Sequence, residues 1–230
     1  MSMRRSPGLF ASIAVTLRLA IPSALPGQVP AGHDHRLFEC ADDGLSRTGS
    51  TGLGCQRLAK YDLPQVSDAP LFWHLAKVPS KATAKAMKWQ TTFVVDAAGQ
   101  SWLFSFGPED AAPKQGHHVA TVGPLPLAPA KSYAVVAYFV VMPVGAYTMV
   151  HTHPGPEAWY VLEGAQCLDT PGGALRVAAG QTGIAPPDTP MQLLNSGSVT
   201  RRALFIVVHD AAQPWGSPFD WKPSGACGAG

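Results

Sequence analysis

The sequence is poor in charged residues. Only 14% of its 230 residues are Asp, Glu, Lys or Arg, well below the roughly 25% that soluble domains usually contain. The formal net charge is +2, and no cluster of Lys and Arg runs along the chain. We therefore expect no basic face for nucleic acid. No segment reaches the roughly 18–20 uninterrupted apolar residues of a membrane span, so none is expected.

Several common catalytic and binding motifs are also missing. The sequence has no Cys-x-x-Cys pair, which argues against a structural zinc knot. It has no Gly-x-Ser-x-Gly nucleophile turn, no phosphate-binding P-loop and no glycine-rich dinucleotide turn. The chemistry of this chain must therefore rest on another arrangement of residues.

Residues 1–31 have the features of a signal peptide. A basic start at Arg4 and Arg5 precedes a mostly apolar run, Leu9–Ile21, and small residues stand at 29–31 for a signal peptidase. We therefore expect a mature chain that begins near Gly32 and is periplasmic or secreted. The alternative is a cytoplasmic protein with a peripheral N-terminal segment.

Four cysteines allow three pairings, and the spacing favours one bridge. Cys40 and Cys55 enclose a stretch rich in Gly, Ser and Thr that has little apolar content to fix it. A disulfide between them would contribute about 3 kcal/mol in the entropic description of such bonds. The alternative is two free thiols, and the sequence does not assign Cys167 or Cys227.

Residues 32–130 read as a loop followed by a small α+β lead-in. The residues from Ser80 to Lys88 have the Ala, Lys and Met content and the Ser N-cap of a short helix. Apolar runs predict strands around this helix, at Phe72–Ala76, Thr91–Val95 and Ser101–Phe106.

Residues 131–210 predict a different architecture. Short β-rich runs alternate with Gly, Pro, Asp and Asn turns about every 8–12 residues, which is typical of an antiparallel barrel or sandwich. The expected strands are Tyr133–Val141, Thr148–His151, Ala158–Leu162, Ala165–Leu168, Leu175–Val177, Gly183–Ala185, Met191–Leu194 and Ala203–His209. The Pro/Gly-rich tail, 211–230, is expected to wrap this barrel with Trp215, Phe219 and Trp221.

One group of residues has the chemistry of a metal site. His151 and His153 are two residues apart on an expected strand, so their side chains leave from the same face. Glu157 follows a Pro-Gly-Pro turn that returns its carboxylate towards the two imidazoles. Two neutral imidazoles and one carboxylate suit Fe, Mn, Zn or Ni and leave positions open for water or substrate.

The spacing around this group resembles the first motif of the cupin superfamily without a gap. The residues that match are Gly145, His151, His153, Glu157 and Gly164. The resemblance covers about residues 131–210 and implies a cupin-type antiparallel β-barrel, or jelly roll. The overall expectation is a mainly β protein with a small α+β N-terminal extension.

The second cupin motif is matched with two departures. Gly180, Pro186 and Asn195 agree with it, but Asp188 stands in place of a glycine and Met191 in place of the last metal-binding histidine. A thioether is a poor ligand for Fe, Mn or Zn, although Cu(I) would accept it.

Three interpretations of this departure stay open. The first is a three-ligand site with an open face, and the second is a metal-free pocket whose polar groups only form hydrogen bonds. The third is a site that His209 completes, although a hydrogen bond from His209 to the backbone is the simpler expectation. Alternation along the strands predicts a largely apolar pocket lined by Tyr147, Met149, Trp159, Met191, Asn195 and His209.

The resemblance implies a protein that binds one divalent metal ion (Fe, Mn, Zn, Ni or Cu) and acts on a small organic molecule. Oxygenase- or isomerase-type chemistry is expected, with Glu157 also able to serve as a catalytic base. The alternative is a non-catalytic module that binds or senses a small ligand. A further alternative is a structural homodimer paired through the lead-in.

Overall fold

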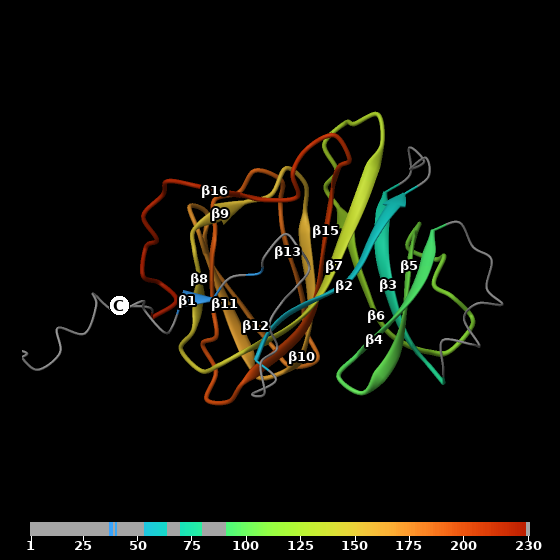
Figure 1. Ribbon diagram of the computed structural model, residues 1–230, viewed down its shortest axis with the longest axis horizontal. Coiled ribbons are helices and arrows are strands. Elements are labelled where there is room, and N and C mark those ends of the chain that lie inside the picture. Colours follow the sequence, from blue (N-terminus) through green and yellow to red (C-terminus); the bar gives the residue numbers. More distant parts are fainter. Residues whose placement is uncertain (1–36, 39, 41–52, 64–69, 80–90, 229–230) are drawn as a thin grey trace, which may run out of the picture. The chain divides into compact units, whose positions relative to one another are not determined.

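The computed structural model describes residues 37–38, 40, 53–63, 70–79 and 91–228, all within the structural unit 34–230. These residues form strands and loops, without helices (Figure 1). The expected signal peptide and the expected helix at 80–88 lie outside the described residues. No helix in the described part of the chain is long and apolar enough to cross a membrane.

Most strands of the second half of the chain lie in two five-stranded sheets. In spatial order, the first contains β1 (Leu37–Phe38), β8 (Tyr147–Thr148), β14 (Gln192–Leu194), β11 (Ala165–Thr170) and β12 (Gly173–Ala178). The second contains β13 (Thr182–Ala185), β10 (Glu157–Glu163), β15 (Arg201–Asp210), β7 (Tyr133–Met142) and β2 (Gly54–Leu63). The sheets face each other without closing into a continuous barrel, which is a jelly-roll arrangement and confirms the predicted fold class.

The central strands β7 and β15 of the second sheet are buried on both faces. On the inner face Tyr138, Trp159 and Phe205 pack towards the first sheet. On the outer face Phe139 and Leu204 pack against a third sheet. Burial on both sides explains why β7 and β15 read as nearly continuous apolar runs rather than as an alternating pattern.

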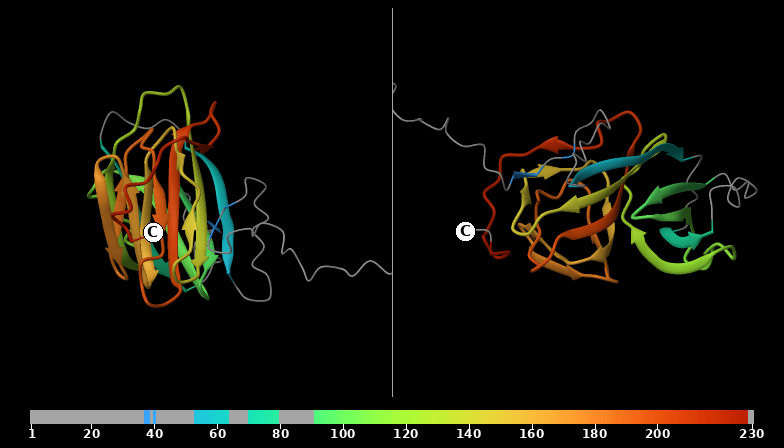
Figure 2. Two further views of the ribbon diagram at one scale, coloured as in Figure 1. Left: turned by 90° about the vertical axis from the view of Figure 1, so that its left-hand side faces the viewer. Right: turned by 60° about the horizontal axis from the view of Figure 1, so that its bottom comes forward.

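The third sheet comes from the lead-in. Its spatial order is β4 (Thr92–Ala97), β5 (Gln100–Gly107), β3 (Leu71–Val78) and β6 (His117–Leu125), all antiparallel. The strand β2 also precedes residue 131, yet it pairs with β7 along its length, from Gly54 opposite Val141 to Leu63 opposite Tyr133 (Figure 2). The lead-in therefore supplies both an edge strand of the jelly roll and a cover for its outer face.

The motif positions occupied by glycine have a backbone that other residues rarely adopt. Gly145, Gly164 and Gly180 all have positive φ, and a Cβ on Gly164 would lie 3.1 Å from the Arg201 Cα. Asp188, which replaces a motif glycine, has φ of 54° and so keeps the left-handed conformation. Asp is one of the few other residues that visit this region readily, so the departure preserves the turn.

Candidate metal centre

A tight turn places the three predicted ligands together. The two histidines lie in and just after β9 (His151–Thr152), and Glu157 opens β10. Between them Gly155 is pressed against β15, where a Cβ would overlap the carbonyl oxygen of Val208. One candidate ligand atom from each of His151, His153 and Glu157 lies within 4.8 Å of the others.

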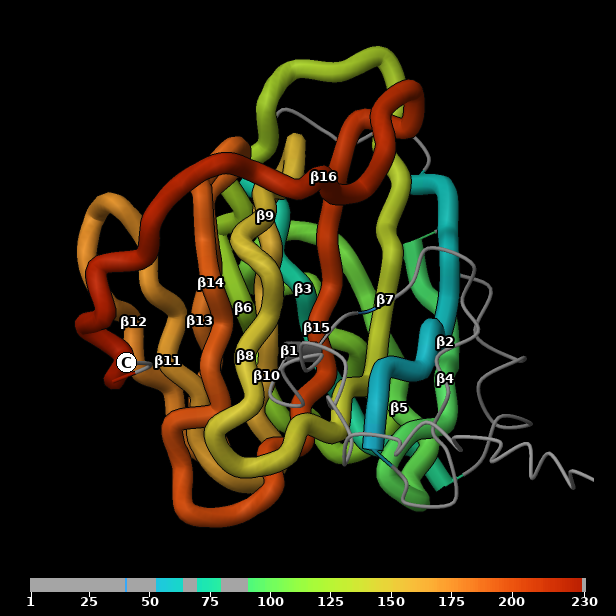
Figure 3. The backbone as a smooth tube through the Cα atoms, turned by 60° about the vertical axis from the view of Figure 1, so that its left-hand side comes forward, coloured from blue at the N-terminus to red at the C-terminus, as the bar shows by residue number. Residues whose placement is uncertain are grey.

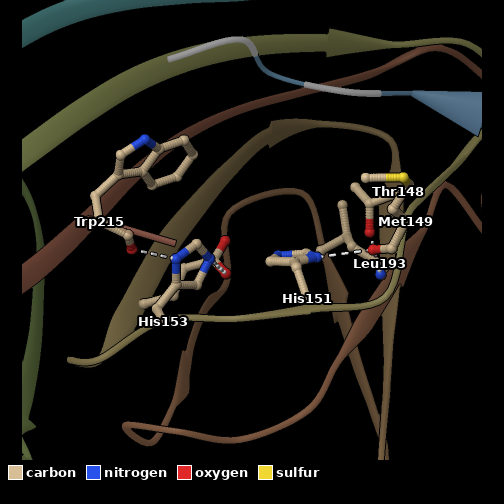
Figure 4. A network of polar contacts seen from close by, with 7 residues as sticks. Thr148, Met149, His151, His153, Leu193 and Trp215 are labelled. Atoms are coloured by element: carbon tan, nitrogen blue, oxygen red, sulfur yellow. Dashed lines mark hydrogen bonds and ion pairs between the residues drawn. The ribbon is translucent and has the colours of Figure 1, made fainter. Parts of the chain in front are cut away.

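Both imidazoles are oriented by backbone carbonyls. The Nδ1 of His151 lies 2.8 Å from the Met149 carbonyl oxygen, and the Nδ1 of His153 lies 2.7 Å from that of Trp215 (Figure 4). A carbonyl oxygen can only accept, so each Nδ1 must carry a proton and donate it. With Nδ1 protonated, Nε2 is the ring nitrogen whose lone pair a neutral imidazole offers to a metal.

The distance between His153 and Glu157 fits two ligands of one ion. The His153 Nε2 and a Glu157 carboxylate oxygen are 3.2 Å apart. Both are electron-pair donors in these protonation states, so a shared proton or a cation must hold them together. Two ligands about 2.1 Å from an ion lie about 3.0 Å apart at a right angle and about 3.4 Å apart at the tetrahedral angle.

The electrostatics of the pocket affect the pKa of His151 and of Glu157. Burial lowers the pKa of His151, and the neighbouring His153 lowers it further, so His151 stays neutral at neutral pH. Burial alone would raise the pKa of Glu157, but the hydrogen bond with His153 and the positive charge that His153, His151 and Arg201 carry when protonated lower it below its ordinary value. A neutral His151 and an ionised Glu157 are in the forms that a divalent cation requires of its ligands.

The three residues open into a cavity of about 320 Å³, which is within the range of small-molecule sites. Its other lining residues are mostly apolar, with Arg201 as the one basic side chain among them. They are Cys40, Val140, Met142, Thr148, Met149, Leu193, Arg201, Phe205, Trp215, Gly216, Ser217 and Pro218.

Of the six residues predicted to line the pocket, Met149 does so and the other five do not. Trp159 and Met191 face inward as alternation predicted, but they belong to the packed core. The Asn195 amide donates to the carbonyls of Met142 and Val199. The remaining two corrections concern Tyr147 and His209.

Tyr147 lies on the opposite face of its sheet from the cavity. It packs with Cys167, Leu194 and Cys227, because the strand is interrupted between β8 and β9 and alternation does not carry across the gap. His209 is buried and donates from Nδ1 to the Asp210 carbonyl, 2.8 Å away. Among the described residues, His209 is not part of the ligand group.

Met191 is the backbone partner of His151. The two residues form an isolated antiparallel bridge in which each N–H donates to the other's carbonyl, at 2.9 and 3.1 Å. Met191 is fully buried. The position that resembles that of a fourth ligand is therefore beside the cluster, but it carries an apolar side chain in this chain.

The C-terminal strap, residues 211–228, runs past β9 and contacts the site (Figure 3). The spacing of the ligand residues does not indicate this contact. The strap's short strand β16 (Ser217–Pro218) pairs with β9, and the Trp215 ring stacks on His153 with centroids 5.2 Å apart. Beyond this point the Cys167–Cys227 disulfide fastens the strap to β11. The structure also contains the predicted Cys40–Cys55 disulfide.

Arg201 is a lining residue that sequence reasoning missed. It begins β15 and is 2% exposed. Burial lowers its pKa to about 10, with the charge of Glu157 opposing that shift, so the guanidinium remains protonated at neutral pH. Arg201 shares a face of β15 with Phe205, because it lies four residues earlier on a strand whose side chains alternate. Sequence reasoning did not place it inside because a buried arginine is uncommon.

Comparison with known proteins identifies the domain that carries this site. Residues 138–207 match the family model described as Cupin domain. No curated protein matches the sequence. Among solved structures, a Cupin 2 conserved barrel domain protein from Salinispora arenicola aligns at 23% identity and a TM-score of 0.31, over 34% of this chain and 65% of that one.

Two other solved structures align to a similar extent. A cupin-like protein from Thermotoga maritima aligns at 21% identity over 41% of this chain and 69% of its own, with a TM-score of 0.35. A salicylate 1,2-dioxygenase from Pseudoaminobacter salicylatoxidans aligns at 18% identity over 32% of this chain and 20% of its own, with a TM-score of 0.29. The chain thus spans just under two thirds of the first of the three structures. The matched segment 138–207 contains all three residues of the ligand group, so the candidate metal centre lies within a cupin domain.

Proposed function

We propose that the cupin domain binds one divalent metal ion through His151, His153 and Glu157 and acts on a small organic molecule in the adjoining cavity. The observation that carries this proposal is the convergence of two imidazole nitrogens and a carboxylate oxygen within 4.8 Å. Backbone carbonyls hold the Nδ1 of both imidazoles, which fixes the orientation of the two rings. The ion is expected to be Fe, Mn, Zn, Ni or Cu.

The chemistry proposed is of the oxygenase or isomerase type. A bound metal would supply Lewis acidity or a site for oxygen. In this chain the remaining lining is largely apolar, which excludes bulk water and favours an organic substrate over a polyphosphate. Glu157, when not held to the ion, is the nearest carboxylate able to take up a proton from a substrate.

Metal content tests the proposal directly. The full chain is loaded with each candidate ion and dialysed against a mild chelator, and the metal per chain is measured. Wild type is expected to keep close to one equivalent, and His151→Ala, His153→Ala and Glu157→Gln to lose it. His209→Ala is the matched control, because His209 is a buried histidine outside the group and its loss should leave metal retention unchanged.

A second candidate function is a binding or sensing module that holds a ligand without turning it over. The observation in its favour is Met191, which places an apolar side chain beside the cluster where the second cupin motif has a histidine. If wild type keeps no metal after loading with any of the five ions, this second function replaces the first.

We also propose that the protein is exported, with residues 1–31 as its signal peptide. All four cysteines are paired, as Cys40–Cys55 and Cys167–Cys227, and such bonds persist in oxidising compartments. N-terminal sequencing of protein from its native host should find a start near Gly32. An intact Met1 in the cytoplasmic fraction would contradict export.

A further inference from the structure

Arg201 is a buried cation whose backbone position lies well along β15 from the partner of Glu157. Glu157 pairs with Val207 on β15, and Arg201 lies six residues earlier on that strand, which separates the two backbone positions by about 20 Å. The side chains of Arg201 and Glu157 both line the same cavity. The cavity therefore has a metal-binding end and a cationic end.

In the described part of the chain, no carboxylate lies within ion-pair distance of the Arg201 guanidinium. Among the described residues its Nε has no hydrogen-bond partner, and no carboxylate forms an ion pair with it. The adjacent Arg202 differs in each respect, since it is about half exposed and its Nε lies 3.2 Å from a Glu163 carboxylate oxygen. A buried charge is normally paired, so the arrangement at Arg201 calls for an anion from outside the chain.

We propose that Arg201 binds the carboxylate of a small organic acid whose other end lies at the His151, His153 and Glu157 group. The position of that other end rests on the metal-binding function proposed above, whereas the carboxylate contact at Arg201 does not. A guanidinium matches a carboxylate because its planar fork can donate two parallel hydrogen bonds.

The lining between the two ends sets the character of the ligand. Val140, Met142, Leu193 and Phe205 contribute apolar surface to the same cavity. A compact hydrocarbon or aromatic body would bury against them, with its charge at the Arg201 end. A divalent ion together with Glu157 and Arg201 would leave this buried space with a net positive charge, which an anionic substrate offsets.

The test uses two probes of nearly equal shape, hexanoate and hexanamide. Their affinities for the full chain are measured by calorimetry, once with metal-free protein and once with zinc-loaded protein. Hexanoate is expected to bind in both forms, and hexanamide more weakly by about 10-fold to 100-fold, the range expected for loss of a hydrogen bond to a charged group.

Variants then assign the contact to Arg201. Arg201→Met should weaken hexanoate binding by about 10-fold to 100-fold, and Arg201→Lys should weaken it less because the charge remains. Arg202→Met is the matched control and should leave hexanoate affinity unchanged. If Arg201→Met does not fold, Arg201→Lys still decides, because unchanged affinity in a variant without the planar fork would overturn the proposal.

The outcomes separate this inference from the metal-binding proposal. Arg201-dependent binding of hexanoate by a protein that retains no metal would support the carboxylate contact while the metal function fails. Binding that requires zinc, is lost in His151→Ala and survives in Arg201→Met would place the carboxylate on the metal and overturn the role of Arg201. Equal affinity for hexanoate and hexanamide would overturn it as well.

Discussion

Gly216 is the residue at which to test whether the C-terminal strap orients His153 for metal binding. A Cβ at this position would lie 2.8 Å from the Nδ1 and 3.0 Å from the Cε1 of His153. The imidazole is 2% exposed, stacked on Trp215 and held at its other nitrogen by Glu157, so it has little room to retreat. In Gly216→Ala either the ring or the strap must move by several tenths of an ångström.

The expected result is a loss of metal affinity without loss of the fold. Movement of either group lengthens the 2.7 Å hydrogen bond from the His153 Nδ1 to the Trp215 carbonyl. Removing such an orienting contact typically lowers metal affinity about 10-fold to 100-fold, which corresponds to about 1.4–2.7 kcal/mol. A chelator competition titration measures this change, and circular dichroism follows the sheets.

Gly172→Ala is the control for this experiment. The closest atom to a Cβ at Gly172 is the Thr170 Oγ1 at 3.6 Å, which is ordinary contact, and the turn is remote from the cavity. Wild-type metal affinity in Gly216→Ala, together with a circular dichroism spectrum and a melting temperature unchanged from wild type, would refute the idea that the strap orients His153.

Three further predictions concern other parts of the molecule. Met191→His should raise metal retention after dialysis, because position 191 is bridged to His151 and a fourth imidazole there would lie beside the cluster; retention below that of wild type would contradict this. Cys227→Ser should lower the free energy of unfolding, measured in urea, by about 4 kcal/mol, because the bonded cysteines are 60 residues apart and the entropic description scales with that separation. The circular dichroism of the sheets should not change, and stability equal to that of wild type would refute the prediction. Burial lowers the pKa of His74, so the unfolded chain takes up a proton first as the pH falls and stability is lost below about pH 6.5. The urea midpoint of His74→Gln should therefore change less between pH 7 and pH 5 than that of wild type, and parallel changes would exclude His74 as a source of the pH dependence.

The ligand group could be predicted because it is local. His151, His153 and Glu157 lie within seven residues, and a strand period followed by a tight turn is enough to bring them together. The jelly roll could be predicted from the regular succession of apolar runs and turns. For the third sheet the sequence predicted strands but not their packing on the jelly roll, because an apolar run does not show which faces of a strand are covered.

The shape of the cavity could not be predicted in the same way. Alternation along a strand gives the direction of a side chain, and for Trp159 and Met191 that direction was inward. It does not separate the packed part of the interior from the open part. The atom that orients His153 is a backbone carbonyl 62 residues away, and neither the identity of Trp215 nor the cupin motifs indicate it.

The Cys167–Cys227 bond has a consequence for the resistance of the protein to proteolysis. It closes a covalent ring that contains Arg201, all of β15 and the strap that reaches over His153. A protease that cuts the backbone once within this ring, for example in the loop between β14 and β15, leaves two pieces that are still one molecule. Such a nicked protein would keep both ends of its cavity in place until the disulfide itself is reduced.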